Sequence, residues 1–171
     1  NKDRKVSSND DMQGSYLGPE YSQDIIETEL KKIGAKYSVM SEDEIIDKTS
    51  ESLKEGDAIG WFQGRMEFGP RALGGRSILG DPRSPSMQKN LNLKVKYRES
   101  FRPFAPSILE NDVNNWFKMS VKSPYMLLVS EIKDDKKIEM NDAEKNLFGI
   151  DKLNIKRSEI PAVTHVDYSA R

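Results

Sequence analysis

The sequence contains no cysteine and a single histidine in its 171 residues. The lack of cysteine excludes disulfides, a thiol nucleophile and cysteine-ligated metal sites. One histidine argues against a histidine-rich metal centre or a histidine-based triad, so we expect no metal ligands in this chain. No apolar run approaches the roughly 20 residues of a membrane helix, and the first residues are not typical of a signal peptide. The sequence therefore predicts a cytoplasmic protein without membrane contact.

Charge is nearly balanced over the whole chain but concentrated in one part of it. The chain has 27 Lys and Arg against 28 Asp and Glu, a formal net charge of -1. Residues 64–102 contain nine basic and three acidic residues, so this stretch carries +6 and the remainder −7. A positive field confined to one segment is typical of a local anion-binding site rather than a generally basic surface.

Residues 64–83, here called the arginine–glycine segment, read GRMEFGPRALGGRSILGDPR. Four arginines and five glycines follow directly on an apolar stretch, residues 57–63. Glycine lets a backbone approach a ligand closely, and arginine offers a fixed fork of donors that matches phosphate. The spacing fits neither a P-loop nor a dinucleotide fingerprint. The segment predicts a polyanion cradle; a solvated surface loop whose arginines pair with acids is the plainer alternative.

Basic residues also follow the next predicted helix. Lys96 and Arg98, with Arg102 shortly after, either oppose the negative end of the helix dipole or reach into the cradle. His165 ends a predicted strand and is either structural or catalytic.

Two acids and one aromatic residue lie inside the arginine–glycine segment. Glu67 and Asp81 either pair with the arginines, which we favour, or help to hold Mg²⁺. Phe68 is, like most aromatic residues, more typical of a core than of an adenine shelf.

Helices and short strands alternate along the chain, which favours an α/β or α+β layer fold. The hydrophobic pattern predicts helices over residues 22–33, 41–56 and 111–117 and from Ser84 onward, and strands over 36–40, 57–63, 77–79, 125–130 and 162–166. Ser41 and Glu44 form a capping-box pattern. Residues 1–21 are polar and broken by glycine and proline, so we expect a tail or linker there and a domain over 22–171. Both ends look cut, which indicates a piece of a longer polypeptide.

Three stretches strongly resemble one family. The arginine–glycine segment, residues 91–109 (LNLKVKYRESFRPFAPSIL) and residues 162–171 (AVTHVDYSAR) are similar to the C-terminal domain of the NodU/CmcH-type O-carbamoyltransferases. Residues 16–22 (YLGPEYS) resemble the segment where that domain begins. The resemblance covers nearly the whole chain.

The resemblance implies a YrdC-like α+β fold, a twisted, mixed open sheet with flanking helices, incomplete here at its C-terminus. These enzymes carbamoylate a hydroxyl on nodulation factors, antibiotics or related sugars. Their C-terminal domain makes a carbamoyl-adenylate from carbamoyl phosphate and ATP, for which we expect Mg²⁺ on the triphosphate. An N-terminal actin/sugar-kinase-like domain with a bound metal then transfers the carbamoyl group, so this chain alone would lack the acceptor site.

The resemblance and the charge pattern together assign the site residues. Lys96-x-Arg98 is similar to the Lys-x-Arg signature of YrdC-like proteins. Catalytic roles fall to Arg71, Lys96 and Arg98, which would bring the two anionic substrates together. Substrate and nucleotide binding is expected from Arg65, Phe68, Gly69, Arg71, Arg76, Ser77, Lys96, Arg98, Arg102 and His165.

Two positions depart from the family pattern. The family usually has Asn where this chain has Gly75, and Gly where it has Tyr168. The competing interpretation of the whole pattern is a nucleic-acid module of the tRNA-modification type. The slight net negative charge and the lack of aromatic residues interleaved with the basic ones argue against it.

Overall fold

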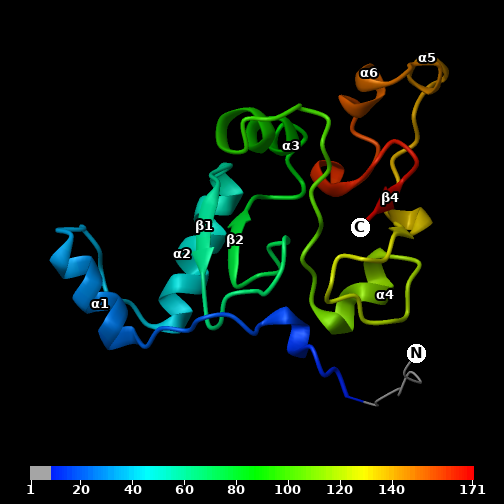
Figure 1. Ribbon diagram of the computed structural model, residues 1–171. Helices are drawn as coiled ribbons and strands as arrows, with labels where there is room; N and C mark the ends of the chain where they lie inside the picture. The colour runs from blue at the N-terminus through cyan, green and yellow to red at the C-terminus, as the bar shows by residue number, and fades with distance from the viewer. Residues whose placement is uncertain (1–8) are drawn as a thin grey trace. The chain divides into compact units, whose positions relative to one another are not determined.

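The computed structural model describes residues 9–171 and shows a mixed α/β protein (Figure 1). This confirms the expected α+β class, with the strands in two two-stranded sheets rather than one larger open sheet. The chain divides into two compact units. The first unit runs up to Lys48 and resumes over Gly60–Ile78, and the second comprises Thr49–Ile59 and Leu79–Arg171.

The helices are α1 (Gln23–Lys32), α2 (Glu42–Glu55), α3 (Met87–Asn90), α4 (Val113–Trp116), α5 (Asp142–Lys145) and α6 (Ile150–Leu153). The strands β1 (Ile59–Phe62) and β2 (Arg76–Leu79) form one sheet. The strands β3 (Ser130–Glu131) and β4 (Ser169–Ala170) form the other and pair antiparallel, with Ser130 opposite Ala170. No helix within residues 9–171 is long and apolar enough to cross a membrane.

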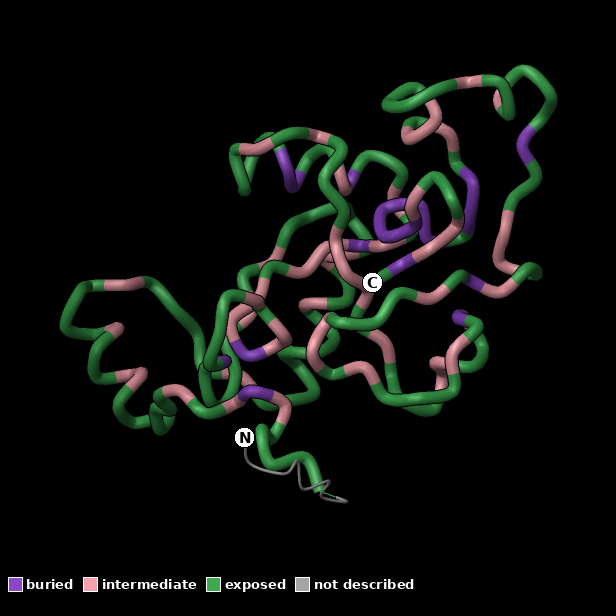
Figure 2. Tube along the Cα trace, turned by 45° about the vertical axis from the view of Figure 1, so that its right-hand side comes forward, coloured by how far each residue is buried: buried purple, intermediate pink, exposed green. Residues whose placement is uncertain are grey.

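The two longest helices begin and end where local chemistry predicts. The capping box at the start of α2 is confirmed, because the Ser41 N–H donates to the Glu44 carboxylate (2.8 Å) and the Glu44 N–H donates to the Ser41 hydroxyl (3.4 Å). The chain leaves α1 through Gly34, whose φ of 67° suits glycine. Neither helix buries a residue (Figure 2), so packing contributes little to their stability.

Four expected elements differ in the structure. The predicted strand over 125–130 is wrong except at its last residue, because β3 comprises only Ser130–Glu131. The predicted strand over 36–40 is wrong: Tyr37 and Val39 stay exposed, and no strand among residues 9–171 pairs with this stretch. The predicted strand over 162–166 is also wrong, since Pro161–Val163 forms a 3-10 helix that begins with a residue lacking an N–H for a ladder. The helix expected from Ser84 begins at Met87, because the Ser84 carbonyl accepts the Met87 N–H in a preceding turn (3.3 Å).

Residues 15–20, expected as part of a tail, are hydrogen-bonded to the arginine–glycine segment within the first unit. The Phe68 N–H donates to the Ser15 carbonyl (2.6 Å), and the Tyr16 hydroxyl donates to the Leu73 carbonyl (2.5 Å). Farther along, Met66 exchanges backbone hydrogen bonds with the 18–19 stretch. These contacts join two stretches that lie about fifty residues apart in the sequence.

The hydrophobic core lies in the second unit. One cluster comprises Phe117, Ile132, Ile160, Val163 and Ala170, and Ile132 has no exposed surface. A smaller cluster joins Met87 and Leu91 to Ala162 and includes the partly buried Phe104. These contacts account for several of the buried stretches in Figure 2.

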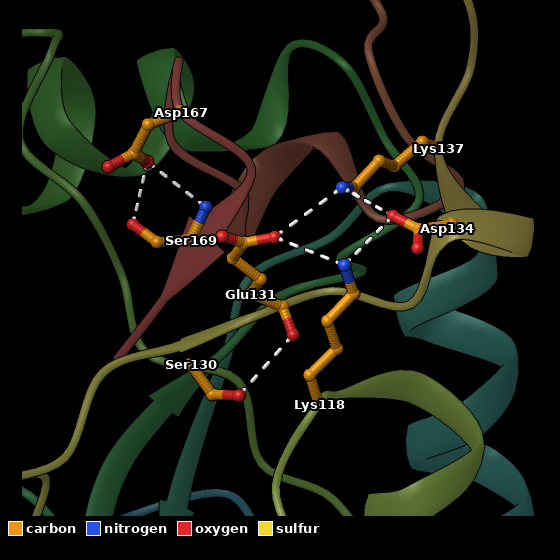
Figure 3. Close-up of polar contacts among 7 residues, drawn as sticks. All are labelled: Lys118, Ser130, Glu131, Asp134, Lys137, Asp167 and Ser169. Carbon is orange, nitrogen blue, oxygen red and sulfur yellow. Dashed lines mark hydrogen bonds and ion pairs between the residues drawn. The ribbon is translucent and has the colours of Figure 1, made fainter.

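Two lysines and two acids form an ion-pair network beside the sheet of β3 and β4 (Figure 3). Lys118 contacts Glu131 (3.3 Å) and Asp134 (3.0 Å), and Lys137 contacts Asp134 (2.6 Å) and Glu131 (3.5 Å). Hydrogen bonds from Lys137 and Lys118 hold the pKa of Asp134 below its usual value. All four side chains are solvent-accessible, so the network adds modestly to stability and fixes how these segments meet.

Candidate anion-binding site

The first half of the arginine–glycine segment folds around the carboxylate of Glu67. The side chain is buried, and one oxygen, Oε1, accepts the backbone N–H groups of Leu73 (2.7 Å), Gly75 (2.8 Å) and Arg76 (3.2 Å). Burial raises the pKa of Glu67, but the hydrogen bonds outweigh it, so the pKa lies below its usual value. The expected pairing of Glu67 with an arginine is replaced by pairing with the loop backbone.

Gly75 is required by the close packing around this carboxylate. A Cβ atom on Gly75 would lie 2.6 Å from the Arg65 carbonyl oxygen and 3.2 Å from the Glu67 carboxyl group. The departure from the family's Asn therefore suits the backbone observed here, because any larger residue would displace it.

Two of the expected ligand-binding arginines use their donors on groups of the protein itself. The Arg76 guanidinium donates to the carbonyls of Gln63 (3.0 Å) and Gly64 (3.2 Å) and lies over the Phe62 ring at 3.4 Å. Arg65 donates to the Gly18 carbonyl (3.0 Å), and its Nε lies 3.5 Å from the Glu20 carboxylate. Arg76 therefore stabilises the start of the loop, and Arg65 joins the loop to residues 18–20.

Arg71 is different from its neighbours. It is half-buried, and no hydrogen bond or ion pair joins its guanidinium to another residue within 9–171. Phe68 is 70% exposed, and Gly69 has a φ of 133° that glycine alone adopts readily. The Ser77 hydroxyl accepts the Gly74 N–H (3.0 Å), which leaves its hydrogen available to donate.

The remaining predicted residues lie in the second unit, where α3 continues as one π-helical turn, Leu91–Val95. Lys96 closes this turn through its N–H to the Leu91 carbonyl (2.8 Å), and its ammonium is exposed. Tyr97 then adopts a φ of 50°, which turns the chain toward Arg98.

Buried Asn92 holds Arg98 and the following extended segment. Its Oδ1 accepts Nε of Arg98 (2.6 Å), and its amide donates to the carbonyls of Ser100 (3.1 Å) and Arg102 (2.8 Å). The Arg98 guanidinium lies 5.0 Å from the Phe104 ring centroid. The Arg102 side chain itself pairs with Glu99 at 3.1 Å. Asp81 pairs with Arg83 (2.8 Å), which confirms the expected pairing for that acid.

His165 follows a buried polar turn. Arg157, 1% exposed, donates to the carbonyls of Lys152, Ile155 (3.1 Å) and Thr164 (2.9 Å). Desolvation lowers the pKa of Arg157 from its usual value. The backbone of His165 closes the next turn by donating to the Ser169 carbonyl (2.9 Å). Within that turn Tyr168 has a φ of 64°, a conformation suited to the family's Gly.

The structure divides the predicted site residues between the two units. Arg65, Phe68, Gly69, Arg71, Arg76 and Ser77 belong to the first, and Lys96, Arg98, Arg102 and His165 to the second. In the second unit the helix before Lys96 and the 3-10 turn before His165 meet through Leu91 and Ala162. A single site that joins both sets stays a prediction.

Sequence reasoning missed the residues that hold the site in place. Asn92 has no exposed surface. In the sequence it is a polar residue beside Leu91 of the apolar seam, and such a residue is expected to face solvent. Tyr16 lies in the stretch expected to be a tail, and the signal that could have identified it is the resemblance of residues 16–22 to the start of the family domain. The role of each residue is visible only from the hydrogen bonds that it makes in the folded structure.

Basic side chains from the loop of the first unit and from the helix end of the second give this mixed α/β protein two candidate anion-binding segments. Residues 50–171 match the family described as Carbamoyltransferase C-terminus. The chain belongs to this family.

Relatives with curated names support the same assignment. The chain is 52% identical over 99% of its length to the uncharacterized protein sll1178 of Synechocystis sp., covering 28% of that protein. It is 39% identical over 94% of its length to the nodulation protein NolNO of Sinorhizobium fredii, covering 21%. It is 35% identical over 71% of its length to the 3'-hydroxymethylcephem-O-carbamoyltransferase of Streptomyces clavuligerus, covering 19%. The chain thus spans between 19% and 28% of the length of these relatives.

Proposed function

We propose that this chain is the carbamoyl-adenylate-forming domain of an ATP-dependent O-carbamoyltransferase. The observation that supports this most directly is Arg71, a half-buried cation without a partner among residues 9–171, in a loop fixed by buried hydrogen bonds. Such a group is prepared to meet an anion, because its backbone is already ordered before the ligand arrives. The family description and the named carbamoyltransferase relative support carbamoyl transfer as the reaction. Carbamoyl phosphate and ATP enter as the substrates that the resemblance of the sequence motifs implies.

The proposed reaction has two balanced steps. Water first displaces phosphate from carbamoyl phosphate and gives carbamate. A carbamate oxygen then attacks the α-phosphorus of ATP, and the bond to pyrophosphate breaks. Arg71, Lys96 and Arg98 would offset the repulsion between carbamate and triphosphate and stabilise the charge on the leaving pyrophosphate, with Mg²⁺ entering as part of the ATP substrate.

The acceptor and the second transfer belong to the rest of the proposed enzyme. The named relatives are about four to five times longer than the matched region, which leaves room for an actin/sugar-kinase-like N-terminal domain with its own metal. We place the reaction in the cytoplasm, where ATP is available.

The test is carbamoyl-phosphate-dependent ATP–pyrophosphate exchange by the full-length protein. Arg71→Ala and Lys96→Ala should each lower the rate about 10²–10³-fold, the usual loss for one charge-stabilising donor. Lys31→Ala, a matched change at an exposed position on α1, should leave it unchanged. Unchanged exchange in both Arg71→Ala and Lys96→Ala would refute the assignment.

A thermal-shift experiment separates the enzyme from the nucleic-acid module. ATP with Mg²⁺ or carbamoyl phosphate should raise the melting temperature of the full-length protein, because a ligand that binds the folded state stabilises it. A short RNA that raises it instead would favour the nucleic-acid interpretation.

A further inference from the structure

The Glu67 carboxylate occupies the position that a bound anion takes in many loops. One of its oxygens receives three backbone N–H groups that lie within four consecutive residues, Leu73, Gly75 and Arg76 being the donors. Converging backbone N–H groups of this kind form a nest that binds phosphate or carboxylate. Here the chain fills the nest with its own side chain, so these amides are not available to a substrate phosphate.

The carboxylate does this without neutralising a nearby cation. No ion pair joins Glu67 to a lysine or arginine within residues 9–171, and its hydrogen bonds come from the backbone. Three N–H dipoles balance its charge instead, which explains a pKa below the usual value despite burial. The positive charge of Arg71 therefore stays available.

The fixed nest also limits how the loop can move. The backbone of residues 68–72 is closed into a ring, because Glu67 at one end holds the N–H of Leu73 at the other. The Tyr16 hydroxyl holds the carbonyl of Leu73 as well, and Gly75 fits only because it lacks a Cβ. Arg71 is one of the residues whose backbone this hydrogen bond encloses.

We propose that Glu67 is a positioning residue: as an internal anion, it shapes the loop that presents Arg71 to the phosphate groups of the substrate. This inference rests on the proposed function for the identity of the ligand. Pre-ordering the loop lowers the conformational entropy that anion binding would otherwise cost. Glu67 thus acts through Arg71, and polyanions are bound by side chains rather than by the loop backbone.

The first test asks whether Glu67 acts through Arg71. The dissociation constant of inorganic pyrophosphate is measured by calorimetry on the full-length protein and on Glu67→Ala, Arg71→Ala and the double variant. The two single changes should weaken binding by similar factors, and the double variant should bind no more weakly than Arg71→Ala. If the loss of affinity in the double variant equals the product of the losses in the two single variants, the proposal is overturned. If Glu67→Ala does not fold, Glu67→Gln, which keeps the shape but not the charge, takes its place in the cycle.

The second test is chemical rescue and has its own control. Formate at millimolar concentration should restore pyrophosphate binding to Glu67→Ala by entering the emptied nest, and should not restore it to Arg71→Ala. Formate that rescues both variants or neither contradicts the assigned roles.

The third readout is amide hydrogen exchange of residues 73–76, which needs no activity. Glu67→Gln should speed exchange at least about tenfold there, corresponding to about 1.4 kcal/mol, and Glu29→Gln on α1 should leave it unchanged. Unaltered exchange in Glu67→Gln refutes the positioning role even in an active enzyme. Conversely, a full-length protein that passes these tests but lacks ATP–pyrophosphate exchange loses the proposed function and keeps this inference.

Discussion

Gly75→Ala is the smallest change that tests the packing of the Glu67 loop. The added methyl group would lie 2.6 Å from the Arg65 carbonyl oxygen, at least about 0.4 Å inside the closest approach that Cβ atoms make. The obstacle is backbone rather than the end of a flexible side chain, so the loop itself has to move. Movement of Gly75 also weakens its N–H bond to Glu67, now 2.8 Å.

The expected cost follows from these two effects. Overfilling a close-packed site costs about 1–3 kcal/mol, and losing a hydrogen bond to a charged group costs about 1.5–3 kcal/mol. The two are coupled, because one displacement causes both, so we expect about 2–4 kcal/mol in the free energy of local opening. A matched control is Gly60→Ala in β1, where the added methyl group would have no atom within 4 Å. Its effect should stay within about 0.5 kcal/mol.

Native-state amide hydrogen exchange on the full-length protein measures this local free energy directly. Residues 73–76 should exchange roughly 30- to 700-fold faster in Gly75→Ala, since each 1.4 kcal/mol is a factor of ten, and at an unchanged rate in Gly60→Ala. Equal exchange in the two variants would refute the packing argument, and with it the reason for Gly75 in place of the family's Asn.

Asn92→Ala should lower the free energy of local opening of residues 91–103 by about 2–4 kcal/mol, because it leaves Arg98 and two carbonyl groups without their buried partner. Amide exchange there should be faster to match, and exchange no faster than in the unchanged protein would contradict this. The ion pairs of Asp134 should stabilise the β3–β4 region above the carboxyl's unfolded pKa of about 4 and lose that effect as pH falls through its lower folded value. An NMR titration of Asp134 should show this lowered pKa, and Lys137→Met should move it back toward the ordinary value; a titration that Lys137→Met leaves unmoved would exclude the ion pair as its cause.

The sequence predicted what local chemistry determines. The helices at residues 23–32 and 42–55 follow from apolar spacing, and the capping box of Ser41 and Glu44 lies where the pattern indicates. The mixed α/β class follows from the alternation of elements. Strand predictions failed where no partner strand exists, as over 36–40, since pairing is not encoded in a five-residue stretch.

The candidate site was predicted by residue type but not by role. Clustered arginines and glycines indicated an anion-binding loop, but whether each guanidinium faces a ligand or its own backbone depends on contacts. Arg76 and Arg71 look alike in the sequence, yet Arg76 donates to the carbonyls beside it and Arg71 does not. Glu67 was expected to pair with a side chain, because the converging amides exist only once the loop is folded.

The bond between Tyr16 and Leu73 spans 57 positions of the chain. During synthesis at about 5–20 residues per second, Tyr16 leaves the ribosome roughly 3–11 seconds before Leu73. Tyr16 therefore stays without this partner for several seconds, and the bond can form only once Leu73 has also emerged. Contacts of such long range form slowly, so the emergence of Leu73 sets the earliest moment at which the hydrogen bonds around the Glu67 loop can be complete.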